Sequence, residues 1–200
     1  MKICIIGAGY VGLSASLCFA TTNNLIYCYD NNKEKIKKLK NVEMPFYEPK
    51  AEELLNKYKN NIIFLDKFNL IPEDIDIYFI AVGTPTLENN EVDTSSVDKI
   101  IENIINKIQK YTLIVNKSTV PIGYNKKIKE SYKNKTTINF DIVSNPEFLR
   151  QGNAIDDFLN PQRVIIGTNS KKAQEILINL YSELNIDKNK LYFLQTKEYN

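Results

Sequence analysis

Three glycines near the N-terminus, Gly7, Gly9 and Gly12, have the spacing G-x-G-x-x-G and directly follow an apolar run, Ile3 to Ile6. This pattern suits a dinucleotide pyrophosphate. The first glycine would form a tight turn, the second would let the backbone approach the phosphates, and the third would let a helix pack against the strand. A phosphate there would also meet free N–H groups at the helix start. The hexamer alone is equally compatible with a simple strand-to-helix turn.

A carboxylate ends the next apolar run, Leu25 to Tyr29, at Asp30. It lies about 20 residues after the glycines, the separation at which an acid binds the adenosine ribose hydroxyls. Asp30 would repel a 2′-phosphate, so we expect NAD rather than NADP. The alternative is that Asp30 caps a helix over residues 33–40. Lys35 on that helix could turn toward a bound cofactor.

Polar groups lie beside proline at the ends of three further predicted strands, in Gly83-Thr84-Pro85, Ser118-Thr119-Val120-Pro121 and Asn145-Pro146-Glu147. Ligands dock at the carboxyl ends of strands in open parallel sheets, so these groups would share one crevice. A hydroxyl there could bridge cofactor and substrate, and a partly buried glutamate could act as general base. Singly, each stretch is also ordinary turn chemistry.

The elements that must position these groups alternate between strand and helix. Strands are predicted at 3–6, 25–29, 62–65, 76–82, 112–116, 140–143, 163–167 and 190–194. Helices are predicted after the glycine loop and at 33–40, 51–59, 97–108, 122–133 and 171–184. Prolines bracket the stretch 45–49 and predict a fixed loop there. The alternation predicts an α/β, Rossmann-type doubly wound, mainly parallel sheet flanked by helices.

Composition narrows the classes of function. The net charge of +2 comes from 26 basic and 24 acidic residues mixed along the chain, so we expect no nucleic-acid or membrane partner. No apolar stretch approaches the roughly 20 residues of a membrane span, and we expect a cytoplasmic protein. The absence of histidine excludes Ser-His and Cys-His nucleophiles. Cys4, Cys18 and Cys28 are expected in the core, without disulfides or a metal site.

Together, five motifs resemble the UDP-glucose/GDP-mannose dehydrogenase family over essentially the whole chain. They stand in family order and at family spacing, as GAGYVG, PFYEP, VGTPT, VNKSTVPIG and SNPEFLRQGNAIDDFLNPQRVIIG. Within the family, NPEFL followed by an acidic turn and by Asn160-Pro161-Gln162-Arg163-Val164 is most similar to the enzymes of UDP-glucose. The resemblance implies an NAD-dependent oxidoreductase, which in its intact form oxidises the C6 alcohol of UDP-glucose twice, with two NAD molecules, through a cysteine thioester that is hydrolysed to UDP-glucuronate.

The resemblance also implies roles for particular residues. The pyrophosphate would lie at Gly7, Gly9, Tyr10, Val11 and Gly12, and the adenosine side at Asp30 and Lys35. The rest of the cofactor would contact Val82, Gly83, Thr84, Pro85, Ser118, Thr119 and Gln151. Two residues would be catalytic: Thr119 would hold the water or hydroxyl near the reacting carbon, and Glu147 would act in proton transfer or thioester hydrolysis. The sugar nucleotide would contact Glu147, Phe148, Leu149, Arg150 and Gln151.

Two departures from the family pattern matter. Gln151 stands where the family usually has glutamate, and it cannot take a proton. The family's nucleophilic cysteine, in GGxCxPKD, and the lysine and asparagine of its central helix have no counterpart in residues 1–200. We therefore expect this chain to be the NAD-binding domain, inactive by itself, of an enzyme that forms homodimers or larger assemblies. The alternatives are a complete, non-catalytic dinucleotide-binding module, a dehydrogenase of another UDP- or GDP-hexose, or another NAD enzyme on the same fold.

Overall fold

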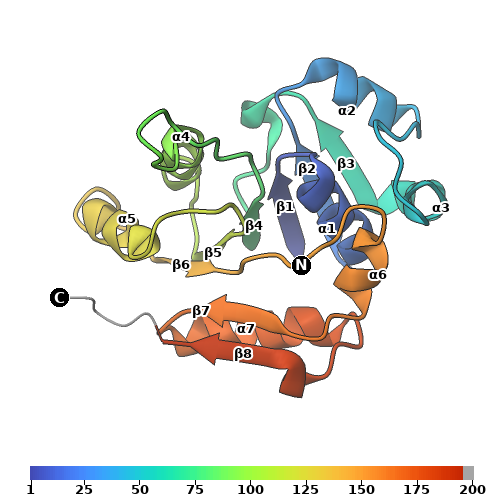
Figure 1. The fold of residues 1–200 in the computed structure, drawn as a ribbon. Helices are drawn as coiled ribbons and strands as arrows, with labels where there is room; N and C mark the ends of the chain where they lie inside the picture. The colour runs from blue at the N-terminus through green and yellow to red at the C-terminus, as the bar shows by residue number, and fades with distance from the viewer. Residues whose placement is uncertain (196–200) are drawn as a thin grey trace.

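All eight strands of the chain form one sheet in the computed structural model, which describes residues 1–195. The strands are β1 (Lys2–Ile6), β2 (Leu25–Tyr29), β3 (Ile62–Leu65), β4 (Ile77–Ile80), β5 (Thr112–Asn116), β6 (Phe140–Ser144), β7 (Val164–Gly167) and β8 (Leu191–Leu194). The α-helices are α1 (Tyr10–Ala20), α2 (Lys33–Lys40), α3 (Ala51–Tyr58), α4 (Ser95–Ile105), α5 (Tyr124–Tyr132), α6 (Ala154–Leu159) and α7 (Lys171–Ser182). Figure 1 shows their arrangement.

The strand order is β3-β2-β1-β4-β5-β6-β7-β8, and the first six strands in this order are parallel. The chain runs outward from β1 to β3, returns to β4 beside β1, and then runs outward in the other direction. This reversal is the topological switch point at which doubly wound sheets bind ligands. The predicted Rossmann-type, mainly parallel sheet is confirmed.

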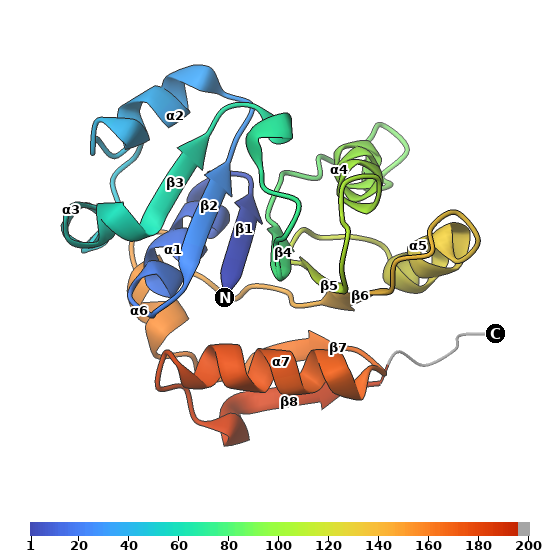
Figure 2. The same ribbon diagram turned by 180° about the vertical axis from the view of Figure 1, so that it is seen from behind.

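The sheet changes direction at β7, which the sequence pattern did not predict. β7 is antiparallel to β6 through a single registered pair, Ser144 with Gly167, whereas β7 and β8 pair in parallel over four residues. Figures 1 and 2 show β7 and β8 at one end of the sheet, with α7 packed against them. Because β6 and β7 share a single registered pair, few ladder hydrogen bonds join β7 and β8 to the other strands, and side chains must supply the rest of the contact.

Alternate residues of β1 belong to different hydrophobic clusters on the two faces of the sheet. Ile3 and Ile5 pack in the cluster that contains residues of α1, α2, α3, α6 and α7, while Cys4 and Ile6 pack in the cluster of α4 and α5. This period of two is what a strand buried on both faces requires. Phe19 lies at the centre of the first cluster, with its ring centroid 5.1 Å from that of Phe79 and 5.2 Å from that of Phe158.

Several element boundaries differ from the predictions, most of them by one or two residues. The predicted strand 76–82 is shorter, the helix predicted at 97–108 is Ser95–Ile105, and the helix predicted from 122 begins at Tyr124 because Gly123 has φ +80°. The six-residue helix α6 was not predicted, since it is too short to show a helical period. The cysteines are free and buried, as expected. Within residues 1–195 no helix is both long enough and apolar enough to cross a membrane.

Candidate functional site

The glycine loop joins β1 to α1, and two of its glycines are required by close backbone contacts. Gly7 has φ +99°, and a Cβ there would lie 2.5 Å from the carbonyl oxygen of Ala81. A Cβ on Gly12 would lie 1.8 Å from the carbonyl oxygen of Gly7. A Cβ on Gly9, by contrast, would have no atom within 4 Å. Gly7 and Gly12 therefore allow the turn and the helix packing, while Gly9 leaves space for a ligand.

The start of α1 lies beside this open space and carries no group that would compete with an anion. Gly9 is the N-cap, no side chain of the described residues caps the helix, and its first turn contains no acidic residue. The first N–H groups of a helix lack intrahelical acceptors, and the helix dipole favours negative charge there. The residues present thus fit a dinucleotide, whose pyrophosphate would bind at the N–H groups of Tyr10 and Val11.

Asp30 follows β2 and is buried against the glycine loop. Its Oδ2 accepts a hydrogen bond from the Ala8 N–H at 2.7 Å and lies 2.9 Å from the Lys35 Nζ. Its Oδ1 accepts from the Asn32 N–H at 2.8 Å. The helix N-cap is Asn32, whose side chain accepts from the Lys35 N–H, so the interpretation of Asp30 as the cap of α2 is wrong.

A cavity of about 560 Å³, here called the glycine-loop cavity, lies over these groups. Gly7, Gly9, Asp30, Lys35, Val82 and Gly83 line it, as predicted for a cofactor site. Sequence reasoning missed six further residues that line the cavity: Tyr29, Phe68, Ser96, Lys99, Ile100 and Asn103. Ile100 belongs to the predicted helix 97–108, but nothing in the pattern indicated that it reaches the crevice.

A second cavity, of about 340 Å³ and here called the strand-end cavity, lies where β4, β5 and β6 end. Its lining includes Val11, Val82, Gly83, Thr84, Ser118, Thr119 and Glu147, so the three predicted strand-end stretches do meet. The Ser118 hydroxyl accepts from the Val82 N–H at 3.0 Å and donates to the Val82 carbonyl at 2.8 Å. Ser118 therefore holds the two strand ends together, whereas the exposed Thr119 carries a hydroxyl that a ligand can reach.

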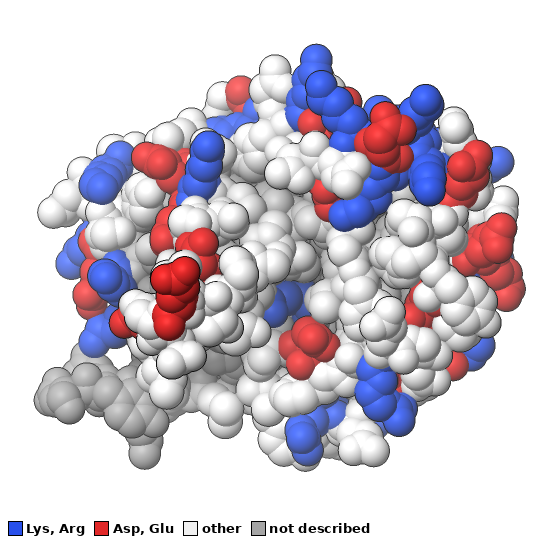
Figure 3. All heavy atoms as spheres, turned by 45° about the horizontal axis from the view of Figure 1, so that its top comes forward, with Lys and Arg blue, Asp and Glu red and all other residues white. Residues whose placement is uncertain are grey.

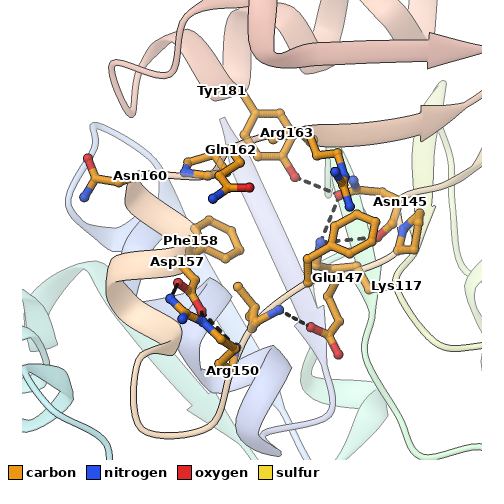
Figure 4. Close-up of a pocket in the computed structure, with 15 residues that line it drawn as sticks. Lys117, Asn145, Glu147, Arg150, Asp157, Phe158, Asn160, Gln162, Arg163 and Tyr181 are labelled. Atoms are coloured by element: carbon orange, nitrogen blue, oxygen red, sulfur yellow. Dashed lines mark hydrogen bonds and ion pairs between the residues drawn. The ribbon is translucent and has the colours of Figure 1, made fainter.

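A third cavity, of about 430 Å³, lies along the segment 145–163 and is here called the turn cavity. Figure 4 shows its lining, which includes Glu147, Phe148, Leu149 and Arg150 from the predicted substrate stretch. Arg150 forms an ion pair with Asp157, with Nη2 2.7 Å from Oδ1 and Nε 3.0 Å from Oδ2. The guanidinium of Arg163 lies 5.1 Å from the ring centroid of Phe148.

The segment that carries the turn cavity is tied to the predicted fixed loop by Glu48. This buried carboxylate accepts hydrogen bonds from the N–H of Gly152 at 2.9 Å and from the N–H of Ala154 at 2.8 Å. It thus satisfies backbone donors at the start of α6. Sequence reasoning noticed the prolines around Glu48 but not the acid itself, because its partners lie about 100 residues further along the chain.

Three predicted site residues have surroundings that the sequence did not indicate. Pro85 and Gln151 are exposed, and they line none of the three cavities. The hydroxyl of Tyr10 is buried and has no hydrogen-bond partner among the described residues. Burial, together with the nearby carboxylates of Glu48 and Glu147, raises the pKa of Tyr10 to about 12.

The face of the molecule drawn in Figure 3 is hollowed near its middle, and both basic and acidic atoms are visible in the hollow. Elsewhere on this face the two signs of charge are interspersed. A topological switch point, a glycine loop with an open cradle, and an acid at the end of β2 together define a dinucleotide-binding domain of the Rossmann type.

Comparison with known proteins gives the family. Residues 1–185 match the NAD binding domain of the UDP-glucose/GDP-mannose dehydrogenase family, and the chain belongs to this family, whose cofactor is NAD. UDP-glucose 6-dehydrogenase of Pseudomonas aeruginosa is 37% identical over 189 residues, which are 91% of this chain and 42% of the relative. UDP-glucose 6-dehydrogenase TuaD of Bacillus subtilis is 42% identical over 187 residues, which are 90% of this chain and 40% of the relative.

Solved structures of nucleotide-sugar dehydrogenases have the same fold. A UDP-glucose dehydrogenase from Pyrobaculum islandicum superposes with a TM-score of 0.89 and 28% identity, covering 98% of this chain and 46% of that one. A GDP-mannose dehydrogenase from P. aeruginosa gives a TM-score of 0.84 and 27% identity, covering 98% and 46%. The chain thus spans less than half the length of these relatives.

Proposed function

We propose that this chain is the NAD-binding domain of a UDP-glucose 6-dehydrogenase, an enzyme that oxidises UDP-glucose to UDP-glucuronate. The observation that carries the proposal is the meeting of the glycine loop, Thr119 and Glu147 in adjoining cavities at one edge of the sheet. Support for UDP-glucose over other sugars comes from the names of the relatives at 37% and 42% identity.

Oxidation of an alcohol removes a hydride from carbon and a proton from oxygen. NAD, when bound, accepts the hydride. Within this chain, Gly9 and the start of α1 would hold the pyrophosphate, Asp30 the adenosine ribose, and Val82 to Pro85 with Ser118 the remainder of the cofactor. Thr119 would hold the reacting hydroxyl or a water by a hydrogen bond, and the Glu147 carboxylate would receive the proton.

The sugar nucleotide would lie in the turn cavity, against Phe148, Leu149 and Arg150. Gln151 is exposed, and it would contact the cofactor and the sugar nucleotide once substrate or a further segment covers it. The nucleophilic cysteine would come from outside residues 1–200. The free cysteines Cys4, Cys18 and Cys28 are all buried, and burial raises their pKa values, so they are unsuited to that role.

We further propose that residues 1–200 form one cofactor-binding domain, that a central helix and a substrate-binding half complete the active site, and that the complete enzyme is a homodimer or larger. The relatives' greater length supports this division. A cytoplasmic location accompanies the proposal, because unpaired buried thiols suit a reducing compartment.

The test begins with the gene. The reading frame is sequenced past codon 200, and an uninterrupted frame that encodes a glycine-flanked cysteine is expected. The protein from the full frame should then form two NADH per UDP-glucose and none with GDP-mannose or UDP-N-acetylmannosamine. A stop codon after residue 200 would favour a non-catalytic dinucleotide-binding module instead, and turnover of another sugar nucleotide alone would refute UDP-glucose as the substrate.

A further inference from the structure

Lys117, the first residue after β5, carries a buried ammonium group that the roles above do not use. The residue is 7% exposed. Its Nζ donates to the Asn145 side-chain Oδ1 at 2.9 Å and to the Asn145 main-chain carbonyl at 3.3 Å. The ring centroid of Phe158 lies 5.8 Å away. Within the part of the chain that the structure describes, no carboxylate oxygen lies within 4.0 Å of this ammonium.

Asn145 connects Lys117 to the rest of the site. Its Oδ1 also accepts from the Tyr181 hydroxyl at 2.7 Å, and its Nδ2 donates to the Ile165 carbonyl at 2.8 Å. These contacts join β5, the end of β6, β7 and α7 at the place where β6 and β7 share a single registered pair. Figure 4 shows Lys117, Asn145 and Tyr181 together at one side of the turn cavity. Glu147 follows two residues after Asn145, so this cluster fixes the turn that carries it.

Lys117 also lies where two of the cavities meet. Lys117, Pro146 and Glu147 are the described residues that line both the turn cavity and the strand-end cavity. The junction of the two cavities thus contains one cation and one anion. The other titratable groups around the turn cavity are Arg150 and Asp157, which pair with each other, Arg163, which stacks on Phe148, and Tyr181.

Burying an ammonium without a paired carboxylate is costly, and the hydrogen bonds to neutral Asn145 oxygens offset only part of that cost. A neutral methionine-like side chain could fill the same volume. The charge is therefore explained best by the strength that it gives to the hydrogen bonds on Asn145, the residue that begins the turn to Glu147.

We infer that Lys117 is a positioning residue for the proposed dehydrogenase reaction: through its hydrogen bonds to Asn145 it holds the Asn145-Pro146-Glu147 turn, and with it the carboxylate that receives the substrate's hydroxyl proton. The inference rests on the proposed function for the role of Glu147. In that reaction the hydroxyl O–H bond and one C6–H bond break as the C6=O bond forms, and the proton passes to the Glu147 carboxylate, while NAD, when bound, would supply the hydride acceptor.

The charge has a pH limit that makes the inference testable. Burial lowers the pKa of Lys117 to about 8, against the opposing effect of the Glu147 carboxylate. Below that pH the ammonium is charged and its hydrogen bonds to Asn145 are charge-assisted, and above it this strengthening is lost.

The experiment is a ¹³C NMR titration of the Glu147 side-chain carboxyl carbon in this chain. In the wild type the Glu147 signal should change in a step near pH 8, where Lys117 loses its proton and its hydrogen bonds to Asn145 weaken, and this step should be absent in Lys117→Met.

Two variants serve as controls. Lys117→Arg keeps the charge over this pH range and should show the wild-type Glu147 signal at pH 7 and no step near pH 8. Tyr181→Phe removes a neutral donor from the same Asn145 oxygen and should keep the step near pH 8. A step near pH 8 in folded Lys117→Met, or its loss in Tyr181→Phe, would overturn the inference. If Lys117→Met does not fold, the wild-type step near pH 8 decides: its absence overturns the inference. None of these measurements needs turnover, so failure of UDP-glucose oxidation is a separate result.

Discussion

Gly9 and Gly12 in the β1–α1 loop are needed for different reasons, and one substitution at each position tests the two reasons separately. A Cβ at Gly9 would enter open space, whereas a Cβ at Gly12 would lie 1.8 Å from the carbonyl oxygen of Gly7. Real Cβ atoms keep at least 3.0 Å from such atoms, so Gly12→Ala requires a displacement of no less than 3.0 − 1.8 = 1.2 Å between the helix start and the turn.

The two variants should therefore lose different properties. Overpacking against rigid backbone costs about 3 kcal/mol, so Gly12→Ala should lower the Tm by roughly 6–12 °C. Gly9→Val should cost less than about 1 kcal/mol, the loss of a favourable N-cap residue. Its side chain fills the space of the pyrophosphate, however, and the Kd for NAD should rise at least about tenfold, equivalent to about 1.4 kcal/mol.

Calorimetric titration with NAD and thermal unfolding, followed by circular dichroism, measure both effects on this chain. Gly9→Ala is an intermediate control, with a smaller loss of affinity expected. Wild-type affinity in Gly9→Val would show that the phosphates do not pass over this residue. An unchanged Tm in Gly12→Ala would show that the close approach of α1 to the turn is not the reason for the third glycine.

Three further changes test other parts of the structure. Asp30→Ala should weaken NAD binding about tenfold and reduce the preference over NADP in parallel titrations, and equal NAD affinity would rule out the ribose role. The Arg150 guanidinium beside Asp157 holds the pKa of that carboxyl well below its usual range. Asp157→Asn should therefore lower the Tm at pH 7. This difference in Tm should shrink once the pH falls below about 4, because Asp157 is then protonated in the unfolded chain. A difference that persists in acid would contradict the ion pair. Phe19→Ala, which empties a fully buried site beside Phe158, should cost about 3–5 kcal/mol in urea unfolding, and a loss below about 1 kcal/mol would contradict the packing.

Local sequence patterns were sufficient to predict much of the fold. The glycine loop, Asp30 and the strand-end stretches follow apolar runs directly, and parallel pairing then brings them to one edge of the sheet without further information. The same holds for the free, buried cysteines, which lie within predicted strands and the first helix.

Features that depend on distant pairs were not predictable in this way. Asn145 looked like turn chemistry because its partners, Lys117 and Tyr181, lie 28 and 36 residues away. Glu48 is 104 residues from Gly152. The antiparallel pairing of β7 with β6 depends on the direction in which the chain leaves α6, and this helix is too short to show a helical period in the sequence. A buried polar contact between remote segments leaves no periodic trace in either segment.

The most direct test of the central claim is a crystal structure of this chain with NAD. The pyrophosphate is expected within hydrogen-bond distance of the Tyr10 and Val11 N–H groups, with the adenosine ribose at Asp30 and the nicotinamide toward Thr119 and Glu147. Nucleotide bound at another place, or no nucleotide at a saturating concentration, would contradict the assignment of the glycine loop and its crevice as the cofactor site.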